Sequence, residues 1–274
     1  AEHAGVEVAY VPVDEFGRVS VEAVADALDE DVILVSIMHA NNETGAIQPV
    51  AEIGKLARER GLPFHVDAVQ ALGKTDVQVD ELCADLVSVS AHKINGPKGT
   101  GALYIRRGTE IEPLAHGGDH EGGMRAGTEN VAGIVGFGKA VELRQGPSAA
   151  RERAVMSRLR DRLEAGVTAA VADTVVNGHR RERVGNTSSI SFRGVGAEAI
   201  IVGLDLDGVA ISSGSACAAG STDPSHVLLA MGLEPRQAAS AVRFSLGWGN
   251  TEEEIDRLLE LLPPLVERLR RISV

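Results

Sequence analysis

The stretch VAEIGKLARERGLPFHV, residues 50–66, joins a helical pattern to a strand pattern. We predict a helix over about 50–60 that Gly61 closes, because glycine readily adopts the left-handed conformation found after helix C-termini. A strand is predicted over 63–66. The stretch therefore indicates a fold in which helices and strands alternate.

The neighbouring segments repeat this alternation. Ser20 can cap a helix whose apolar side chains at 21, 24, 25 and 28 follow helical spacing. Further strands are predicted over 32–37, 86–90 and 102–105, and a further helix over 131–143. Short buried strands separated by helices predict an α/β protein with a mostly parallel or mixed sheet.

The second half of the chain has a different pattern and resembles a small α+β domain. Its predicted elements are a long arginine-rich helix over about 150–172, strands over 189–192, near Val209 and over 242–245, and a helix over 197–204. We place a boundary in the loop at 145–147, so that residues 1–148 form a large domain and residues 149–274 a small one.

The C-terminal segment is predicted to be one amphipathic helix. Thr251 and Glu254 have the spacing of a capping box at its start. Pro263 and Pro264 should kink or interrupt this helix, because proline lacks the backbone N–H that a helix requires.

Composition excludes several classes of protein. The 274 residues have a net charge of −12 and only 3% aromatic residues, which argues against binding of nucleic acid or of an anionic membrane surface. No apolar run is long enough to cross a bilayer, and the acidic start is not that of a signal peptide. We therefore expect a soluble cytoplasmic protein that acts on a small molecule.

Polar side chains follow two of the predicted strands. Asp67 comes directly after the strand over 63–66, and Lys93 follows the strand over 86–90. A lysine that forms a Schiff base and a carboxylate that keeps a pyridine nitrogen protonated are what a pyridoxal phosphate enzyme needs. Taken singly, Asp67 could cap a helix and Lys93 could be a solvated charge. The pair indicates a cofactor site beyond the strand ends.

The two cysteines have different surroundings. Cys217 lies in SSGSACAAGS, residues 212–221, a run of small residues that leaves a thiol accessible and indicates a nucleophile. Cys83 lies between Leu82 and Ala84 and is expected in the core. No C-x-x-C spacing occurs, so the sequence suggests neither a disulfide framework nor a metal site.

A further glycine-rich stretch, residues 133–139, approaches the spacing of a phosphate-binding loop. Ala140 stands where a magnesium-binding Ser or Thr is needed, and the stretch lies within a helical pattern rather than after a strand. We therefore do not expect nucleotide binding.

Six ordered runs are SIMHANNETG (36–45), VDAVQ (66–70), SAHK (90–93), RAGT (125–128), SGSAC (213–217) and RFSLG (243–247). Together they resemble the cysteine desulfurases of the NifS/IscS type, which are pyridoxal phosphate enzymes of fold type I in the class V aminotransferase family. The resemblance implies a pyridoxal-phosphate-binding large domain and a small domain with the cysteine loop.

The resemblance also implies roles around the cofactor ring. Lys93 would hold the cofactor as a Schiff base and Asp67 would pair with its ring nitrogen. Gln70 would hydrogen-bond the ring hydroxyl, with Asn42 beside that oxygen and the substrate.

Further implied roles concern the cofactor phosphate and the substrate. Ser90 and His92 would bind the phosphate or flank the ring, with His92 also a candidate acid or base. Thr128 would reach the phosphate of a partner subunit, which implies a homodimer. Arg243 would bind the substrate carboxylate in a bidentate manner, although by itself it resembles a surface charge at a strand end.

The implied activity converts L-cysteine to L-alanine with a persulfide on Cys217, which then supplies sulfur to an acceptor protein for iron–sulfur clusters or thio-modification. Alternatives are a selenocysteine lyase, another class V enzyme or a non-catalytic scaffold. The family pattern also includes an upstream phosphate turn and a stacking histidine, so we expect a segment before Ala1. Trp248 stands where the family commonly has arginine.

Overall fold

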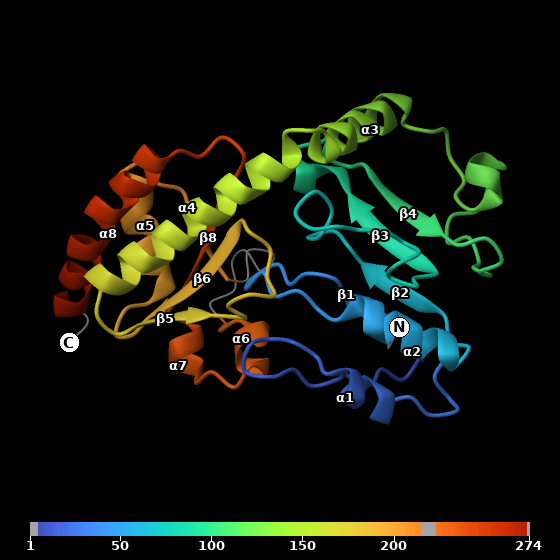
Figure 1. Cartoon of the computed structure of the whole chain (residues 1–274), viewed down its shortest axis with the longest axis horizontal. Helices are drawn as coiled ribbons and strands as arrows, with labels where there is room; N and C mark the ends of the chain where they lie inside the picture. The colour runs from blue at the N-terminus through green and yellow to red at the C-terminus, as the bar shows by residue number, and fades with distance from the viewer. Residues whose placement is uncertain (1–4, 215–222, 273–274) are drawn as a thin grey trace. The chain divides into compact units, whose positions relative to one another are not determined.

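The computed structural model describes residues 5–214 and 223–272, and these divide into two compact units (Figure 1). Unit 1 is built from the described parts of 1–27, 40–49 and 150–274, and unit 2 from 28–39 and 50–149. The first 27 residues thus group with the C-terminal half. The functional division at residue 148 stays a prediction.

Unit 2 contains a mixed four-stranded sheet, as predicted. Its strands, in spatial order, are β1 (Val35–Met38), β2 (Phe64–Asp67), β3 (Leu86–Ser90) and β4 (Gly101–Ile105). The first three are parallel and β4 runs antiparallel to β3. The strand predicted over 32–37 begins later than expected and is not buried throughout. β1 begins at Val35, and Ser36 and Met38 are exposed.

Helix α2 (Val50–Glu59) packs against β1 and β2. Gly61 follows it with φ of 67°, which confirms the predicted glycine stop. A Cβ atom at Gly54 would lie 2.0 Å from the Leu82 carbonyl oxygen, so only glycine permits this close approach. Cys83 is 8% exposed, which confirms its place in the core.

The last helix of unit 2 is α3 (Val131–Gln145), whose N-cap Asn130 accepts a hydrogen bond from the Gly133 N–H at 3.0 Å. Residues 133–139 therefore lie inside a helix, which confirms that they do not form a phosphate-binding loop. Phe137 and Ala140 pack on the short helix η2 (Ala91–Ile94). A second short helix, η3 (His120–Gly123), precedes α3.

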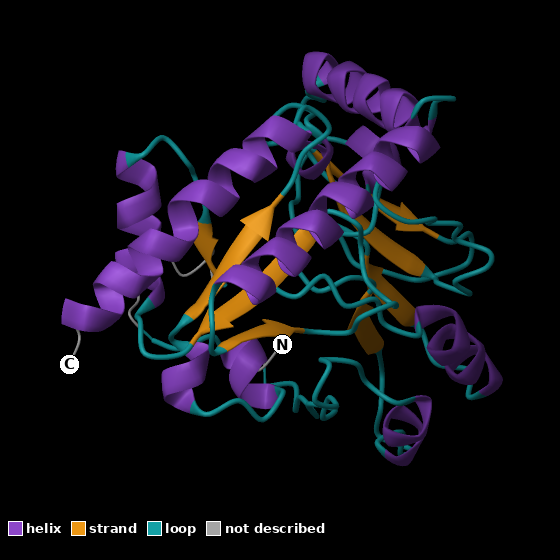
Figure 2. Ribbon diagram, turned by 60° about the vertical axis from the view of Figure 1, so that its left-hand side comes forward, coloured by secondary structure: helices purple, strands orange, loops and turns teal. Residues whose placement is uncertain are grey.

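Unit 1 contains an antiparallel sheet in the order β5 (Thr174–Asn177), β6 (Thr187–Phe192), β8 (Ala241–Ser245), β7 (Ser212–Ser213). The long helices are α4 (Ala149–Ala170), α5 (Ala197–Leu206) and α8 (Glu252–Ile272). Their apolar side chains share one core with β6 and β8, and both sheets with their helices are visible in Figure 2. The short helices are α1 (Val21–Asp26), α6 (His226–Ala230) and α7 (Pro235–Ala238).

One expectation for unit 1 is wrong and one strand was missed. Val209 does not begin a strand: its side chain packs on the core after α5, and the strand lies at Ser212–Ser213. The sequence analysis missed β5. Of the two effects expected of Pro263 and Pro264, interruption does not occur: α8 continues through both, and the buried residues on either side, Leu262 and Leu265, hold it against the core.

The predicted caps in unit 1 are confirmed. Ser20 accepts a hydrogen bond from the Ala23 N–H at 2.9 Å at the start of α1. Thr251 and Glu254 exchange the two bonds of a capping box, at 3.1 and 3.4 Å. Within the described ranges, no helix is long and apolar enough to cross a membrane.

Candidate active site

The parallel strands of unit 2 bring two predicted site segments to one edge of the sheet. Asp67 is the last residue of β2, and Ser90 is the last residue of β3. Asp67 lies beside Ser88 in the register of the two strands, and the Ala68 N–H donates to the Ser88 carbonyl at 3.0 Å. Because parallel strands end at the same edge, the sequence order alone places these groups together.

Asp67 is half-buried and held by its own turn. Its Oδ1 accepts a hydrogen bond from the Val69 N–H at 2.9 Å, and its carbonyl accepts from the His39 N–H at 2.8 Å. The residues after it form turns rather than a helix, so Asp67 does not serve as a helix cap. This leaves its carboxylate available for a positively charged ring nitrogen.

Lys93 is presented by η2 directly after β3. The lysine is half-buried, whereas the neighbouring His92 is exposed. His92 Nδ1 lies 2.7 Å from the hydroxyl of Ser90, so these two predicted phosphate-binding residues contact each other. Asn95 ends η2 in the left-handed conformation, with φ of 65°. Side chains of α3 pack against η2 and fix its position.

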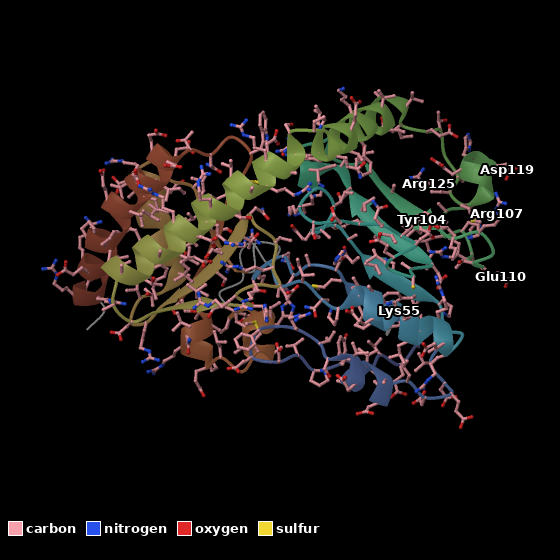
Figure 3. The ribbon with its side chains drawn as sticks, in the orientation of Figure 1. Lys55, Tyr104, Arg107, Glu110, Asp119 and Arg125 are labelled. Atoms are coloured by element: carbon pink, nitrogen blue, oxygen red, sulfur yellow. The ribbon has the colours of Figure 1, made fainter. Side chains whose placement is uncertain are left out.

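The other predicted residues of unit 2 are Gln70 and Thr128. Gln70 Oε1 accepts a hydrogen bond from Lys74 Nζ, which fixes the direction of the amide. Thr128 is exposed in the segment between β4 and α3, and Figure 3 labels Asp119 and Arg125 in the same segment. Its predicted contact with a partner subunit stays a prediction.

The donor set of unit 2 fits pyridoxal phosphate. Lys93 supplies an amine, Asp67 a carboxylate for the ring nitrogen, and the Ser90–His92 pair a hydroxyl and an imidazole for the phosphate. These are the types of group that the cofactor needs, and all of them lie at the ends of β2 and β3 or directly after them.

The sequence analysis missed His65, which links the three parallel strands. Its Nδ1 lies 2.8 Å from the Ser36 hydroxyl and its Nε2 lies 2.8 Å from the Ser88 hydroxyl. Burial lowers the pKa of His65 below 6.5, while the charge of Asp67 raises it. The signal was present, since His65 and Asp67 are two residues apart and so share one face of β2.

The sequence analysis did not single out His39 within the run 36–45 either. It is 5% exposed, and burial lowers its pKa below 6.5. Its Nδ1 has no hydrogen-bond partner among the residues that the structure describes. At pH 7 the neutral imidazole is therefore the favoured form of His39 in the folded state.

In unit 1, Arg243 lies within the sheet rather than at a surface strand end. It pairs in register with Ser189 of β6 and Ser212 of β7, and it is half-buried. Its Nη1 donates to the Asn42 carbonyl at 2.8 Å. Two predicted substrate-binding residues, 201 positions apart, therefore contact each other.

The predicted site residues thus lie in both units, and one of them lies outside the described residues. Unit 2 holds Asp67, Gln70, Ser90, His92, Lys93 and Thr128, and unit 1 holds Asn42 and Arg243. Cys217 lies outside the described residues.

Comparison with known proteins gives the family. The family described as aminotransferase class V matches residues 1–258. The cysteine desulfurase IscS of Clostridium botulinum is 48% identical, with 99% of this chain and 69% of the relative covered, and that of Dictyoglomus turgidum gives the same values. The chain belongs to the class V aminotransferases, in their cysteine desulfurase group. The predicted family is confirmed.

Solved structures confirm the fold of this class V aminotransferase. A structure described as NifS-like protein superposes with a TM-score of 0.89 at 38% identity, covering 98% of this chain and 70% of that one. A structure described as SspA in complex with cysteine gives a TM-score of 0.76 at 36% identity, covering 89% of this chain and 67% of that one. The α/β fold of type I is therefore confirmed.

Proposed function

We propose that this class V aminotransferase removes sulfur from L-cysteine and leaves L-alanine, with pyridoxal phosphate as its cofactor. The observation that carries this proposal is 48% identity to a cysteine desulfurase along 99% of the chain. The placement of Asp67 and Lys93 at the ends of neighbouring parallel strands supports it. A related protein whose structure is described as a complex with cysteine supports the choice of substrate.

Pyridoxal phosphate, when bound, supplies a ring that accepts the electron pair released at the substrate Cα. Lys93 would hold the cofactor through its amine and would also take the proton from the substrate Cα. Asp67 would keep the ring nitrogen protonated, and Gln70 would hydrogen-bond the ring hydroxyl. Ser90 and His92 would bind the phosphate or flank the ring, with His92 available as an acid or base.

Arg243 binds the substrate carboxylate. Its planar guanidinium offers two parallel donors, which suits a carboxylate better than an ammonium group does. The bond from its Nη1 to the Asn42 carbonyl holds the guanidinium in place. Because this bond holds Asn42 against Arg243, Asn42 also lies beside the substrate.

Cys217 takes the sulfur. Its thiolate attacks the sulfur of L-cysteine, a sulfur–sulfur bond forms, and the carbon–sulfur bond breaks with its electron pair left on carbon. Protonation of that carbon yields L-alanine. Cys217–SH and L-cysteine thus give Cys217–S–SH and L-alanine, so no external oxidant is needed.

The active unit is a homodimer in which Thr128 reaches the partner's cofactor phosphate. An acceptor protein then takes the persulfide sulfur for iron–sulfur clusters or thio-modification, and we place this chemistry in the cytoplasm. Neither nucleic acid nor a membrane takes part directly.

The test separates cofactor chemistry from sulfur transfer. Cys217→Ser should retain the cofactor absorption band and its response to L-cysteine but lose sulfide production in the presence of a thiol reductant. The control is Cys83→Ala, which changes the buried cysteine and should keep sulfide production. Sulfide release by Cys217→Ser at the rate of the unchanged enzyme would contradict the proposal.

A further inference from the structure

Residues 69–74 form a series of tight turns shortly after Asp67, at the edge of the sheet where the proposed cofactor groups lie. The Ala68 carbonyl accepts a hydrogen bond from the Ala71 N–H at 3.0 Å, and the Ala71 carbonyl accepts one from the Lys74 N–H at 2.9 Å. Ala68 and Ala71 are fully buried. Internal hydrogen bonds and buried side chains therefore fix the backbone of this 69–74 turn.

The 69–74 turn shares a core with the short helix that presents Lys93. Leu72 packs against the cluster that includes Ala91 and Ile94 of η2. Ile94 directly follows Lys93 in the chain. The turn and the lysine proposed to hold the cofactor are thus positioned by the same apolar contacts.

Within this turn, Lys74 determines the orientation of the Gln70 amide. Lys74 Nζ donates a hydrogen bond to Gln70 Oε1, and both side chains are half-buried. An amide has an acceptor oxygen on one side and a donating –NH₂ group on the other, whereas an ammonium group can only donate. The oxygen of Gln70 must therefore face Lys74, and the –NH₂ group lies on the opposite side of the amide.

A fixed –NH₂ group suits the ring oxygen of pyridoxal phosphate better than a freely rotating amide does. The ring hydroxyl of this cofactor is phenolic, and its anionic form accepts hydrogen bonds strongly. A rotated amide would present its own oxygen to that anion, and two acceptors repel each other. The orientation that Lys74 selects is therefore the one that binds the anionic ring oxygen.

We propose that Lys74 is a positioning residue for the cofactor, which holds Gln70 Oε1 and so directs the Gln70 –NH₂ group to the ring oxygen of pyridoxal phosphate. The proposal rests on the cofactor and on the role of Gln70 proposed above. Without Lys74 the amide can rotate, so that the donor faces the ring oxygen only part of the time and the cofactor binds more weakly.

The experiment titrates the cofactor-free protein with pyridoxal phosphate and follows the visible absorption band, alongside the melting temperature of the same protein. Lys74→Met should weaken binding about tenfold, as expected for loss of a hydrogen bond to a charged group. Lys74→Arg retains a donating cation and should stay within about threefold of the unchanged protein. The control is Lys55→Met, which alters an exposed lysine of α2 labelled in Figure 3 and should not change binding.

Two comparisons test whether Lys74 acts through Gln70 and the ring hydroxyl. Gln70→Ala should itself weaken binding, and addition of Lys74→Met should then cost less than about twofold more, because both changes remove one arrangement. A cofactor analogue that lacks the ring hydroxyl should bind to the unchanged protein and to Lys74→Met within about twofold of each other.

Unchanged binding of pyridoxal phosphate by Lys74→Met would overturn the proposal. A loss of equal size for the analogue, accompanied by a lower melting temperature, would overturn it in favour of a structural role. A loss that adds in full to that of Gln70→Ala would show that Lys74 does not act through Gln70. The proposed function fails differently: the unchanged protein would then form no absorption band, or its band would not respond to L-cysteine, whatever the Lys74 variants do.

Discussion

In unit 2 the proposed cofactor residues Asp67 and Lys93 follow neighbouring strands of one sheet, whereas in unit 1 Arg243 meets Asn42 across 201 residues of chain. The first arrangement follows from local order, because parallel strands end at the same edge. The second depends on the pairing of distant segments. Unit 2 thus holds its functional groups by strand order, and unit 1 holds them by long-range contacts.

The largest expected effect concerns unit 2. Lys93→Ala removes the amine that holds the cofactor, so the visible absorption band should disappear and sulfide production should fall by about 10³-fold or more. The control is Lys98→Ala, which alters an exposed lysine of the same loop and should leave both signals unchanged. A Lys93→Ala enzyme that keeps its absorption band would break the assignment of the cofactor to unit 2.

The next effect concerns unit 1 and should spare the cofactor. Arg243→Lys keeps the charge but loses the planar pair of donors, so KM for L-cysteine should rise by about 10- to 100-fold, as expected for hydrogen bonds between charged groups. The absorption band should be unchanged. The measurement is a titration of the band and of initial rates with L-cysteine, and an unchanged KM would contradict the role of Arg243.

A buried ion pair of unit 1 and an exposed ion pair of unit 2 should contribute differently to the stability of the protein. In unit 1 Arg183 Nη2 lies 2.7 Å from Glu164 Oε2, with side chains 3% and 10% exposed. Glu164→Ala leaves the buried guanidinium without this partner and should lower the free energy of unfolding by about 3 kcal/mol.

The matched control is a pair of the same length in unit 2. Lys139 Nζ and Glu142 Oε1 also lie 2.7 Å apart, but both side chains are exposed, so Glu142→Ala should cost less than about 0.5 kcal/mol. Urea unfolding of both variants measures the difference. Equal losses would show that burial does not distinguish these two pairs.

The smallest effect is a pH dependence that arises in unit 2. Burial lowers the pKa values of His39 and His65 below 6.5 in the folded state. As the pH falls through 6.5, the unfolded chain takes up protons at these positions before the folded chain does, so stability decreases. The stabilisation is complete above pH 6.5 and is lost progressively on acidification.

Melting temperatures between pH 7 and pH 5 measure this effect. His39→Gln with His65→Asn should make the decrease on acidification shallower, whereas the control His116→Gln, at an exposed position, should not. A decrease that is equally steep in all three proteins would contradict the assignment to the two histidines.

The sequence predicted unit 2 better than unit 1 for a physical reason. The strand at 86–90 and the helix starting at 131 were placed correctly, since short apolar runs and capping residues are local signals. The strand near Val209 was wrong and β5 was missed, because two- and four-residue strands owe their position to their partners. The prolines do not interrupt α8, because burial of Leu262 and Leu265 outweighs a local helix-breaking signal.

The sequence by itself determined the alternating fold of unit 2, the placement of Asp67 and Lys93 after neighbouring strands, and the burial of Cys83. These properties depend on the spacing of apolar residues and on which residue follows each strand, and both can be read along the chain. Only the tertiary structure decided that His65 bridges Ser36 and Ser88, that Asn42 holds Arg243, and that Glu43 holds Ser225. Such contacts join residues far apart in the chain, and the packing that brings them together leaves no periodic trace in the sequence.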